Sequence, residues 1–156
     1  MSGRRREIQL SPSEQRKLIE SERVIVVSTL GSRGWPHSMP LWYVPRDGEI
    51  WIYTYAKSQK VRNLERDPRA TLLAETGHEY SELRGIEIEA EAEIHRDLDT
   101  VFELARELTM RYAGDEATLD DDAAEALKTQ ARKRVAVRFE PKRVATWDHR
   151  KLGGAY

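Results

Sequence analysis

The chain has 156 residues, of which 39% are hydrophobic and 34% charged, and its formal net charge at pH 7 is −1. This length suits one domain with its own core, and the balanced charge excludes a general electrostatic attraction to nucleic acid. The absence of cysteine excludes disulfides, thiolate metal sites and cysteine nucleophiles.

The sequence has no pattern typical of a signal peptide or a membrane-spanning segment. No apolar run approaches membrane-spanning length, and no apolar segment follows the basic residues Arg4-Arg5-Arg6. We therefore expect a soluble cytoplasmic protein with no membrane partner and no nucleic-acid partner. We expect residues 1–10 to be a flexible N-terminal tail, residues 11–150 to form one domain and residues 151–156 to be a C-terminal tail.

The first part of the chain predicts one helix followed by strands in hairpins. Ser11 and Glu14 form a capping box with Pro12 at the first helical position, so we expect a helix from there to about Glu20. Turns are expected at residues 31–34 and 45–48. The strands that they connect are expected at residues 24–30, 35–44 and 49–53.

A short basic segment, residues 54–64, follows the third expected strand and leads into a helix expected over residues 58–66. Its hydroxyls and cations are Thr54, Lys57, Ser58, Lys60 and Arg62. The free N–H groups and the positive dipole end of a helix start attract anions, so this segment predicts a phosphate site. Plain surface charge, with Glu65 paired to Arg62 or to another cation, is an equally good interpretation of the same residues.

Further strands are expected at residues 70–74 and 86–94. The second alternates isoleucine or alanine with glutamate, which predicts a half-buried strand with one acidic, solvated face. A metal-binding row of carboxylates is the alternative, but it lacks nearby histidines. Residues 134–140 predict a closing strand, and residues 142–148 either continue it or form an edge strand.

Two helices are expected before the closing strand. Apolar residues recur at helical spacing from Leu98 to Tyr112, with Asp97 as the N-cap. A second helix is expected over residues 123–133, after an acidic loop at 114–122. The order of elements predicts a mainly β, α+β fold with flanking helices, whose six antiparallel strands form a barrel.

The chain offers no evident catalytic acid, base or nucleophile. It has no G-x-S-x-G motif of a serine nucleophile and no glycine-rich dinucleotide-binding motif. None of the histidines has metal-helix spacing; these are His37, His78, His95 and His149. We therefore expect no catalytic residue and no metal ligand, which suits a protein whose reactivity belongs to a cofactor.

Several short segments of the chain occur in the same order as in a known protein family. They are Ser28-Thr29-Leu30 and residues 35–44, 47–54, 57–64 and 67–70, with Arg84-Gly85 before the alternating strand. This ordered set resembles the pyridoxamine 5'-phosphate oxidase-like proteins, also called flavin/deazaflavin oxidoreductases, over about residues 10–150. The resemblance implies a split β-barrel of the FMN-binding type.

The resemblance also implies a homodimer with cofactor sites at the interface and a small-molecule substrate. By that resemblance the cofactor phosphate is held by Lys57, Ser58 and Lys60, with Thr54 and Arg62 nearby. The flavin ring lies along Pro36, His37, Ser38 and Met39. The segment from Trp147 to Arg150 is implied to reach the site from the C-terminal end, in its own subunit or the partner's. Asn63 is implied to fix the helix start.

The chain departs from true pyridoxamine phosphate oxidases at its end, because residues 151–156 are not an arginine-rich, substrate-gripping tail. The pyridoxamine reaction itself is therefore not expected. The basic turn looks more like the subgroup that uses the deazaflavin coenzyme F-420, with FMN nearly as good a candidate.

The leading hypothesis is a flavin- or deazaflavin-dependent oxidoreductase that transfers hydride between the bound cofactor and a small conjugated substrate. The alternative is a non-catalytic dimer that binds or sequesters a flavin or haem, with His37, His78 or His149 as the haem ligand. A regulatory dimer that has lost its ligand is a third hypothesis.

Overall fold

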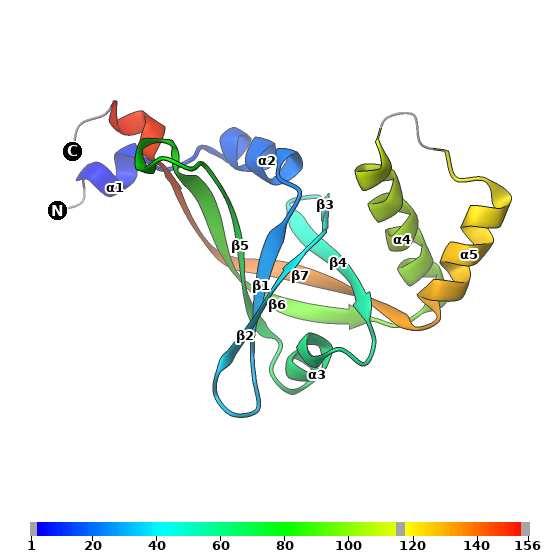
Figure 1. Cartoon of the computed structure of the whole chain (residues 1–156). Helices are drawn as coiled ribbons and strands as arrows, with labels where there is room; N and C mark the ends of the chain where they lie inside the picture. Colours follow the sequence, from blue (N-terminus) through cyan, green and yellow to red (C-terminus); the bar gives the residue numbers. More distant parts are fainter. Residues whose placement is uncertain (1–2, 115–117, 154–156) are drawn as a thin grey trace.

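Seven antiparallel strands form one sheet that curls into a half-barrel (Figure 1). The computed structural model describes residues 3–114 and 118–153. The sheet order is β2-β1-β5-β6-β7-β4-β3. The strands are β1 (Ile25–Leu30), β2 (Pro36–Leu41), β3 (Val44–Arg46), β4 (Glu49–Tyr55), β5 (Arg69–Thr76), β6 (Arg84–His95) and β7 (Arg134–Asp148).

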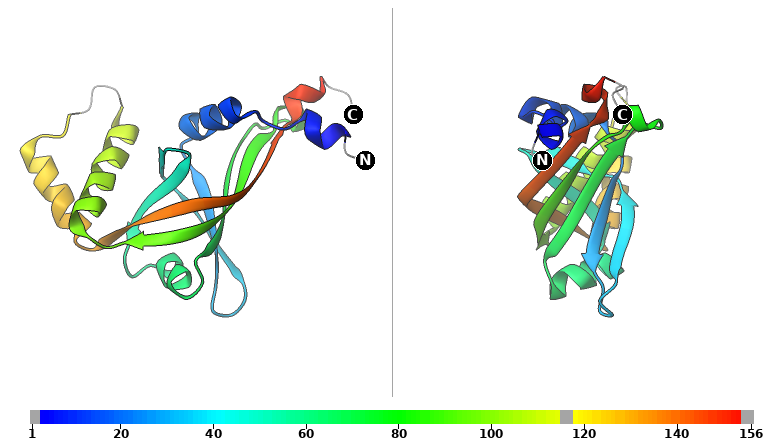
Figure 2. Two further views of the ribbon diagram at one scale, coloured as in Figure 1. Left: turned by 180° about the vertical axis from the view of Figure 1, so that it is seen from behind. Right: turned by 90° about the vertical axis from the view of Figure 1, so that its left-hand side faces the viewer.

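Helices surround this sheet without entering it. They are α1 (Gly3–Glu7), α2 (Pro12–Ser21), α3 (Gln59–Arg66), α4 (Leu98–Ala113) and α5 (Asp121–Ala131), with short 3-10 helices η1 (Tyr80–Glu82) and η2 (His149–Leu152). α2 and α3 lie at opposite ends of the half-barrel, and α4 and α5 project together from one side (Figures 1 and 2). None of the helices in residues 3–114 and 118–153 has the length and apolar character needed to cross a membrane. The expected mainly β fold with flanking helices is confirmed.

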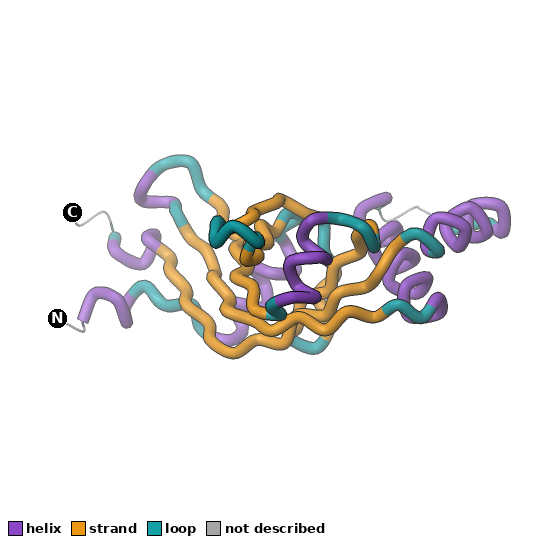
Figure 3. The backbone as a smooth tube through the Cα atoms, turned by 90° about the horizontal axis from the view of Figure 1, so that it is seen from below, coloured by secondary structure: helices purple, strands orange, loops and turns teal. Residues whose placement is uncertain are grey.

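The prediction of six strands was wrong because one expected strand is divided. The sequence predicted a single strand over residues 35–44, but the chain bends at Trp42 and Tyr43. The first half, β2, pairs with β1, and the second half, β3, pairs with β4. Since β2 and β3 are the two edges of the sheet, this bend brings the edges together and curls the sheet (Figure 3).

Tyr43 shows why the bend occurs. Its side chain is completely buried, and its hydroxyl donates to the carbonyl oxygen of Ile19 near the end of α2, at 2.6 Å. In a straight strand, the side chains of residues 42 and 43 would point to opposite faces of the sheet, and the chain would continue to pair with β1. Burial of the tyrosine ring and its hydrogen bond to α2 therefore favour the bent chain.

The main core fills the concave side of the sheet, where alternating strand residues point inward. Its fully buried members include Val27, Ile52, Leu72, Val137 and, from α3, Val61. Each such side chain contributes about 1.5–3 kcal/mol through burial. A second cluster joins α4 and α5 to the outer face of β4 and β7; it comprises Val44, Val101, Leu104, Ala131 and Ala136. These clusters hold α3 and the ends of β4 and β7 in fixed positions.

The predicted helix starts are largely confirmed. Ser11 and Glu14 form the expected capping box, and Asp97 caps α4 through a hydrogen bond from the Thr100 amide at 2.9 Å. α5 begins at Asp121 rather than at residue 123, because Asp120 caps it and acidic residues stabilise its positive end. Residues 115–117 of the expected acidic loop lie outside the described residues.

Residues 142–148 continue the closing strand, so the edge-strand alternative is wrong. β7 passes through Pro141 because the β6–β7 register shifts between Glu89 and Ala90. Such a bulge tolerates a proline, which lacks an N–H for the ladder. The acidic face of β6 is exposed as expected, and β7 cations pair with it: Glu89 with Arg143, Glu91 with Lys142 and Glu93 with Arg138.

The two ends of the chain lie near each other beside α2 (Figure 1). Within the expected N-terminal tail, α1 is helical and Leu10 belongs to the main core. Lys151 of the expected C-terminal tail donates to Glu14 at 2.8 Å. Packing therefore extends to Leu10 and Lys151, and the flexibility of the tails stays a prediction.

Candidate functional site

The predicted phosphate segment is the tight connection between β4 and α3. The Ser58 amide donates to the Tyr55 carbonyl at 3.1 Å, and the Ala56 amide donates to the Lys133 carbonyl at 3.1 Å. Ser58 occupies the N-cap of α3, yet its hydroxyl caps no backbone amide. The same hydroxyl is buried and has no hydrogen-bond partner in the described chain. The start of α3 thus keeps its N–H donors for another acceptor.

Lys60 turns inward from the first turn of α3. It is only 8% exposed, and its Nζ donates to the Thr54 hydroxyl at 3.1 Å. Burial lowers the pKa of Lys60, and the nearby charge of Arg134 lowers it further. No carboxylate in the described part of the chain opposes these effects. A buried cation whose partner is one neutral hydroxyl is unfavourable until an anion joins it.

Glu65, the acidic residue next to this turn, does not neutralise the cations of the turn. In the surface-charge interpretation Glu65 pairs with Arg62 or with another cation, and in the structure it forms an ion pair with Arg96, in the β6–α4 connection. Arg62 and Lys57 are exposed and form no ion pair with the residues that the structure describes. The turn therefore presents two free surface cations beside the buried one.

A hollow of about 280 Å³ lies between the β1–β2 hairpin and the start of α3. Trp35 and His37 line it from the hairpin, and Gln59 and Asn63 line it from α3. The Nδ1 atom of His37 is buried and has no hydrogen-bond partner among the described residues. The structure thus brings the predicted ring-binding strand next to the predicted phosphate-binding helix.

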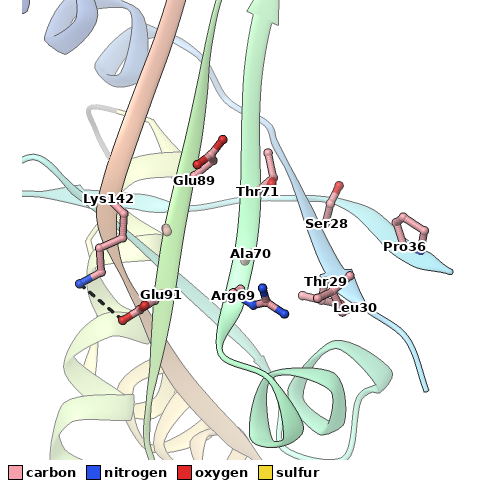
Figure 4. Close-up of a pocket in the computed structure, with 11 residues that line it drawn as sticks. Ser28, Thr29, Leu30, Pro36, Arg69, Ala70, Thr71, Glu89, Glu91 and Lys142 are labelled. Atoms are coloured by element: carbon pink, nitrogen blue, oxygen red, sulfur yellow. Dashed lines mark ion pairs between the residues drawn. The ribbon is translucent and has the colours of Figure 1, made fainter. Parts of the chain in front are cut away.

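A larger and shallower hollow, of about 590 Å³, lies across the outer face of β1, β5 and β6 (Figure 4). Ser28, Thr71 and Glu89 lie on its floor, and Pro36 borders both this hollow and the smaller one. The Ser28 hydroxyl lies 2.8 Å from that of Ser38. The two hollows therefore lie next to each other, with Pro36 at the border of both.

Asn63 ties α3 to β1 beneath the smaller hollow. It is fully buried, its amide donates to the Thr29 hydroxyl at 3.0 Å, and its Oδ1 accepts from Gln59 at 2.8 Å. These bonds fix the start of α3 against the hairpin, which is the structural role that the resemblance implied. They also explain why an asparagine, with both donor and acceptor, stands at this position.

The predicted site residues are only partly assembled within one chain. Pro36 and His37 border the hollows near α3, and Thr54 and Ser58 lie with Lys60 in the β4–α3 turn. Met39 on β2 is 41% exposed and lines neither hollow. Trp147 packs against Gly85, where the end of β7 pairs with the start of β6. This end of β7 lies away from α3 (Figure 1). The two groups of residues do not meet in the single chain.

Sequence reasoning missed Arg134, the first residue of β7. Strand pairing sets Arg134 opposite Tyr55, directly beside the phosphate turn. Local sequence gives no signal for this neighbour, because the contact depends on which strands pair. From the sequence alone, a cation at the start of a strand cannot be distinguished from an ordinary surface charge.

The chain was compared with known families and solved structures. Residues 11–148 match the family described as pyridoxamine 5'-phosphate oxidase. A search of the curated proteins found no match. A solved structure of a conserved hypothetical protein, Rv2991 from Mycobacterium tuberculosis, is 37% identical, with a TM-score of 0.88 over 99% of this chain and 95% of that chain.

More distant solved structures share the fold alone. One is described as an F420 reductase; it is 20% identical, with a TM-score of 0.65 over 86% of this chain and 98% of that chain. Another is HutZ, the haem storage protein from Vibrio cholerae; it is 13% identical, with a TM-score of 0.67 over 86% of this chain and 94% of that chain. At such identities the same half-barrel serves proteins with different ligands.

Proposed function

Since the chain belongs to the pyridoxamine 5'-phosphate oxidase family, we propose that it is a flavin- or deazaflavin-dependent oxidoreductase. Its cofactor is FMN or the deazaflavin coenzyme F-420, and its substrate is a small conjugated molecule. The bound ring supplies the hydride chemistry, which matches the lack of an evident acid, base or nucleophile in the sequence. The chain itself binds the phosphate, orients the ring and excludes water.

The observation that carries this proposal is the unbalanced charge at the β4–α3 turn. Lys60 is buried against a neutral hydroxyl, and the Ser58 hydroxyl is buried without a described partner. Both FMN and F-420 carry a phosphoryl group, which suits a helix start with a buried cation. The residues present therefore fit the anionic part of either cofactor.

The ring is proposed to lie along β2. β2 is an edge strand, and its Pro36 has no N–H with which to pair a further strand. The open side of β2 is therefore free for a ligand. Pro36 borders both hollows, and His37 lines the smaller one. The larger hollow is shallow and lies on the outer face of the sheet, so we propose that a second copy of the chain covers it and encloses the ring.

Direct titration tests the proposal. The absorption spectrum of the purified protein is recorded first, and the protein is then titrated separately with FMN and F-420. A dissociation constant of 1 mM corresponds to a binding free energy of about −4 kcal/mol. For one of the two cofactors we expect a constant far below 1 mM. If neither cofactor binds below that concentration, the proposed function is wrong.

A variant pair localises the bound phosphate. Lys57→Ala removes an exposed cation at the turn and is expected to weaken cofactor binding by about tenfold, the effect of a charge-assisted contact. Arg16→Ala removes an exposed cation from α2, at the opposite end of the half-barrel, and is expected to leave binding unchanged. Equal losses in both variants would show that only the overall charge matters.

A non-catalytic haem- or flavin-binding dimer is the second candidate. The half-buried His37, whose Nδ1 has no partner in the described chain, is the observation that favours it. Titration with haemin distinguishes the two: a Soret shift that His37→Ala abolishes, with no ring-cofactor binding, would support the haem function. Flavin binding without acceptor-dependent reoxidation of the reduced ring would support sequestration.

A further inference from the structure

The smaller hollow lies between two elements that are fixed against each other. The β1–β2 hairpin and α3 are side by side at one end of the half-barrel (Figures 1 and 2). Asn63 of α3 joins them through its hydrogen bond to the Thr29 hydroxyl of β1, at 3.0 Å. The hollow of about 280 Å³ falls just below the range of about 300–1,000 Å³ for drug-sized ligands, so it suits a smaller molecule.

Trp35 borders this hollow from a tightly bonded turn. The Gly31 amide donates to the Trp35 carbonyl at 3.0 Å, and the Gly34 amide donates to the Gly31 carbonyl at 3.0 Å. Gly34 has a φ of +81°, and a Cβ at Gly31 would conflict with the Trp35 carbonyl, so both positions require glycine. The backbone at Trp35 is therefore held in place, although its side chain is 75% exposed.

His37 adds a polar atom to the same hollow. Trp35 and His37 both line it, with one residue between them, as the alternation of an extended chain places them. The Nδ1 atom of His37 is buried and has no hydrogen-bond partner among the described residues. An imidazole nitrogen donates or accepts a hydrogen bond according to its tautomer. The hollow thus offers an aromatic face and a polar ring atom that a ligand can use.

The charge around the hollow is positive. Arg33 is the one formally charged residue that lines it, and it forms no ion pair within residues 3–114 and 118–153. Arg66 lies nearby, since its guanidinium donates to the Leu30 carbonyl at the end of β1. The start of α3 contributes the positive end of its dipole, and the Ser58 hydroxyl caps none of its amides. This setting favours a negatively charged ligand.

Ordinary surface exposure does not account for these features together. A single exposed apolar side chain needs no explanation. Here an exposed indole, an unpaired guanidinium and a buried imidazole nitrogen surround one hollow. An indole stacks on flat rings, and a guanidinium binds carboxylates through charge-assisted hydrogen bonds. A planar molecule with a carboxylate uses all three groups.

We propose that the smaller hollow binds a planar, conjugated carboxylate, with its ring against Trp35 and its carboxylate toward Arg33 and the Nδ1 atom of His37. Pro36 borders both this hollow and the larger one, where the cofactor ring is proposed to lie. The bound carboxylate is therefore the substrate of the proposed oxidoreductase. This substrate class rests on the proposed function, whereas the binding itself requires no cofactor.

Three small molecules separate the contributions of ring and charge in the protein without cofactor. Cinnamate is planar and anionic, cinnamamide is its neutral analogue, and cyclohexanecarboxylate is anionic without an aromatic ring. Calorimetric titration is expected to give cinnamate a dissociation constant of about 1 mM or lower, and at least about fivefold tighter binding than either other molecule. In NMR spectra, cinnamate should shift the indole N–H signal of Trp35, which Trp35→Phe identifies among the four tryptophans.

Two variants and two matched controls locate the site. Arg33→Gln is expected to remove the preference for cinnamate over cinnamamide and to leave cinnamamide affinity unchanged. Trp35→Ala is expected to weaken both by at least about threefold. The controls are Arg132→Gln, at an exposed arginine after α5, and Trp42→Ala, at an exposed tryptophan that stacks on Tyr112. Both controls should stay within about twofold of wild type.

The outcomes distinguish this inference from the proposed function. A wild-type preference for cinnamate in folded Arg33→Gln, or equal losses in variants and controls, would overturn the inference. Competition between cinnamate and a bound cofactor would also overturn it, because the smaller hollow would then hold the cofactor. If neither FMN nor F-420 binds but cinnamate shows the expected variant effects, the oxidoreductase proposal fails and the carboxylate site stands. If a cofactor binds and cinnamate does not, the inference alone is wrong.

Discussion

Replacement of Lys60 by methionine is expected to stabilise the empty protein and to weaken cofactor binding. Lys60 is 8% exposed, and burial lowers its pKa, so the folded state disfavours its charge. Methionine fills similar space without a charge. Exchange of buried charged groups for apolar side chains of similar volume is neutral or stabilises by up to about 4 kcal/mol. The loss of the Thr54 hydrogen bond offsets about 1 kcal/mol of this gain.

The net change in the free energy of unfolding is therefore roughly −1 to +3 kcal/mol for Lys60→Met, and it is stabilising over most of this range. In a domain of this size, such a change raises the unfolding midpoint by up to about 10 °C. Urea titration and thermal unfolding of the ligand-free protein measure it. Lys57→Met, which changes an exposed lysine of the same turn, is the control and is expected to remain within about 0.5 kcal/mol of wild type.

The outcome for binding has the opposite sign. Lys60→Met is expected to weaken FMN or F-420 binding by about 10–100-fold through the loss of a charged donor. If the ligand-free variant is destabilised by more than about 2 kcal/mol, Lys60 is a satisfied structural residue and the reasoning about the anion site is refuted. A stabilised variant with unchanged affinity would remove Lys60 from the site.

The pH dependence follows from the same residue. Because the folded-state pKa of Lys60 lies below its ordinary 10.5, the folded state loses this proton first as the pH rises. Between the two pKa values the unfolded state binds more protons, so the stability of the ligand-free protein rises with pH in that window. Phosphate affinity falls through the same window, since the charged form of Lys60 binds the anion. Lys60→Met should remove both trends.

Three further measurements test other parts of the structure. In a double-mutant cycle, Thr29→Val and Asn63→Leu should each destabilise by about 1–3 kcal/mol and their combination by clearly less than the sum; additive losses would refute the buried bond. Gly85→Ala places a Cβ in steric conflict with the Trp147 ring, so a loss of about 1–3 kcal/mol and altered indole fluorescence are expected, and neither would appear if the ring moves freely. The hydrogen bond from Lys151, followed by those from Ser11, lowers the pKa of Glu14 to about 2. Its stabilisation should be lost as the pH falls from 4.5 towards 2, and Glu14→Gln should remove that part of the acid transition.

The locally determined parts of the fold were predictable from the sequence. The capping box at Ser11, the N-cap at Asp97 and the hairpin turns depend on residues within a few positions of one another. The bend at Trp42 and Tyr43 was not predictable, because the pattern of residues 35–44 is compatible with a straight strand. Its cause, the burial of Tyr43 against the end of α2, involves a partner outside that pattern.

The same distinction applies to the candidate site. The phosphate turn was predicted from sequence because its hydroxyls and cations lie within nine residues, and the structure places Thr54 against Lys60. The contact of Arg134 with the end of β4 was not predictable, because strand pairing, and not sequence proximity, brings it to Tyr55. The proposed contribution of Trp147 stays a prediction, since this residue lies at the far end of the sheet and depends on a second subunit.

The proposed anion site is held together by contacts that leave its positive charge unneutralised. Lys60 is positioned by the Thr54 hydroxyl, and Ser58 is positioned by the start of α3. A carboxylate at any of these points would stabilise the empty protein and compete with the ligand. Neutral contacts instead fix each donor before binding, so little ordering is needed when an anion arrives. The groups that destabilise the empty protein are then those that bind the phosphate, which is why stability and affinity should change in opposite directions in Lys60→Met.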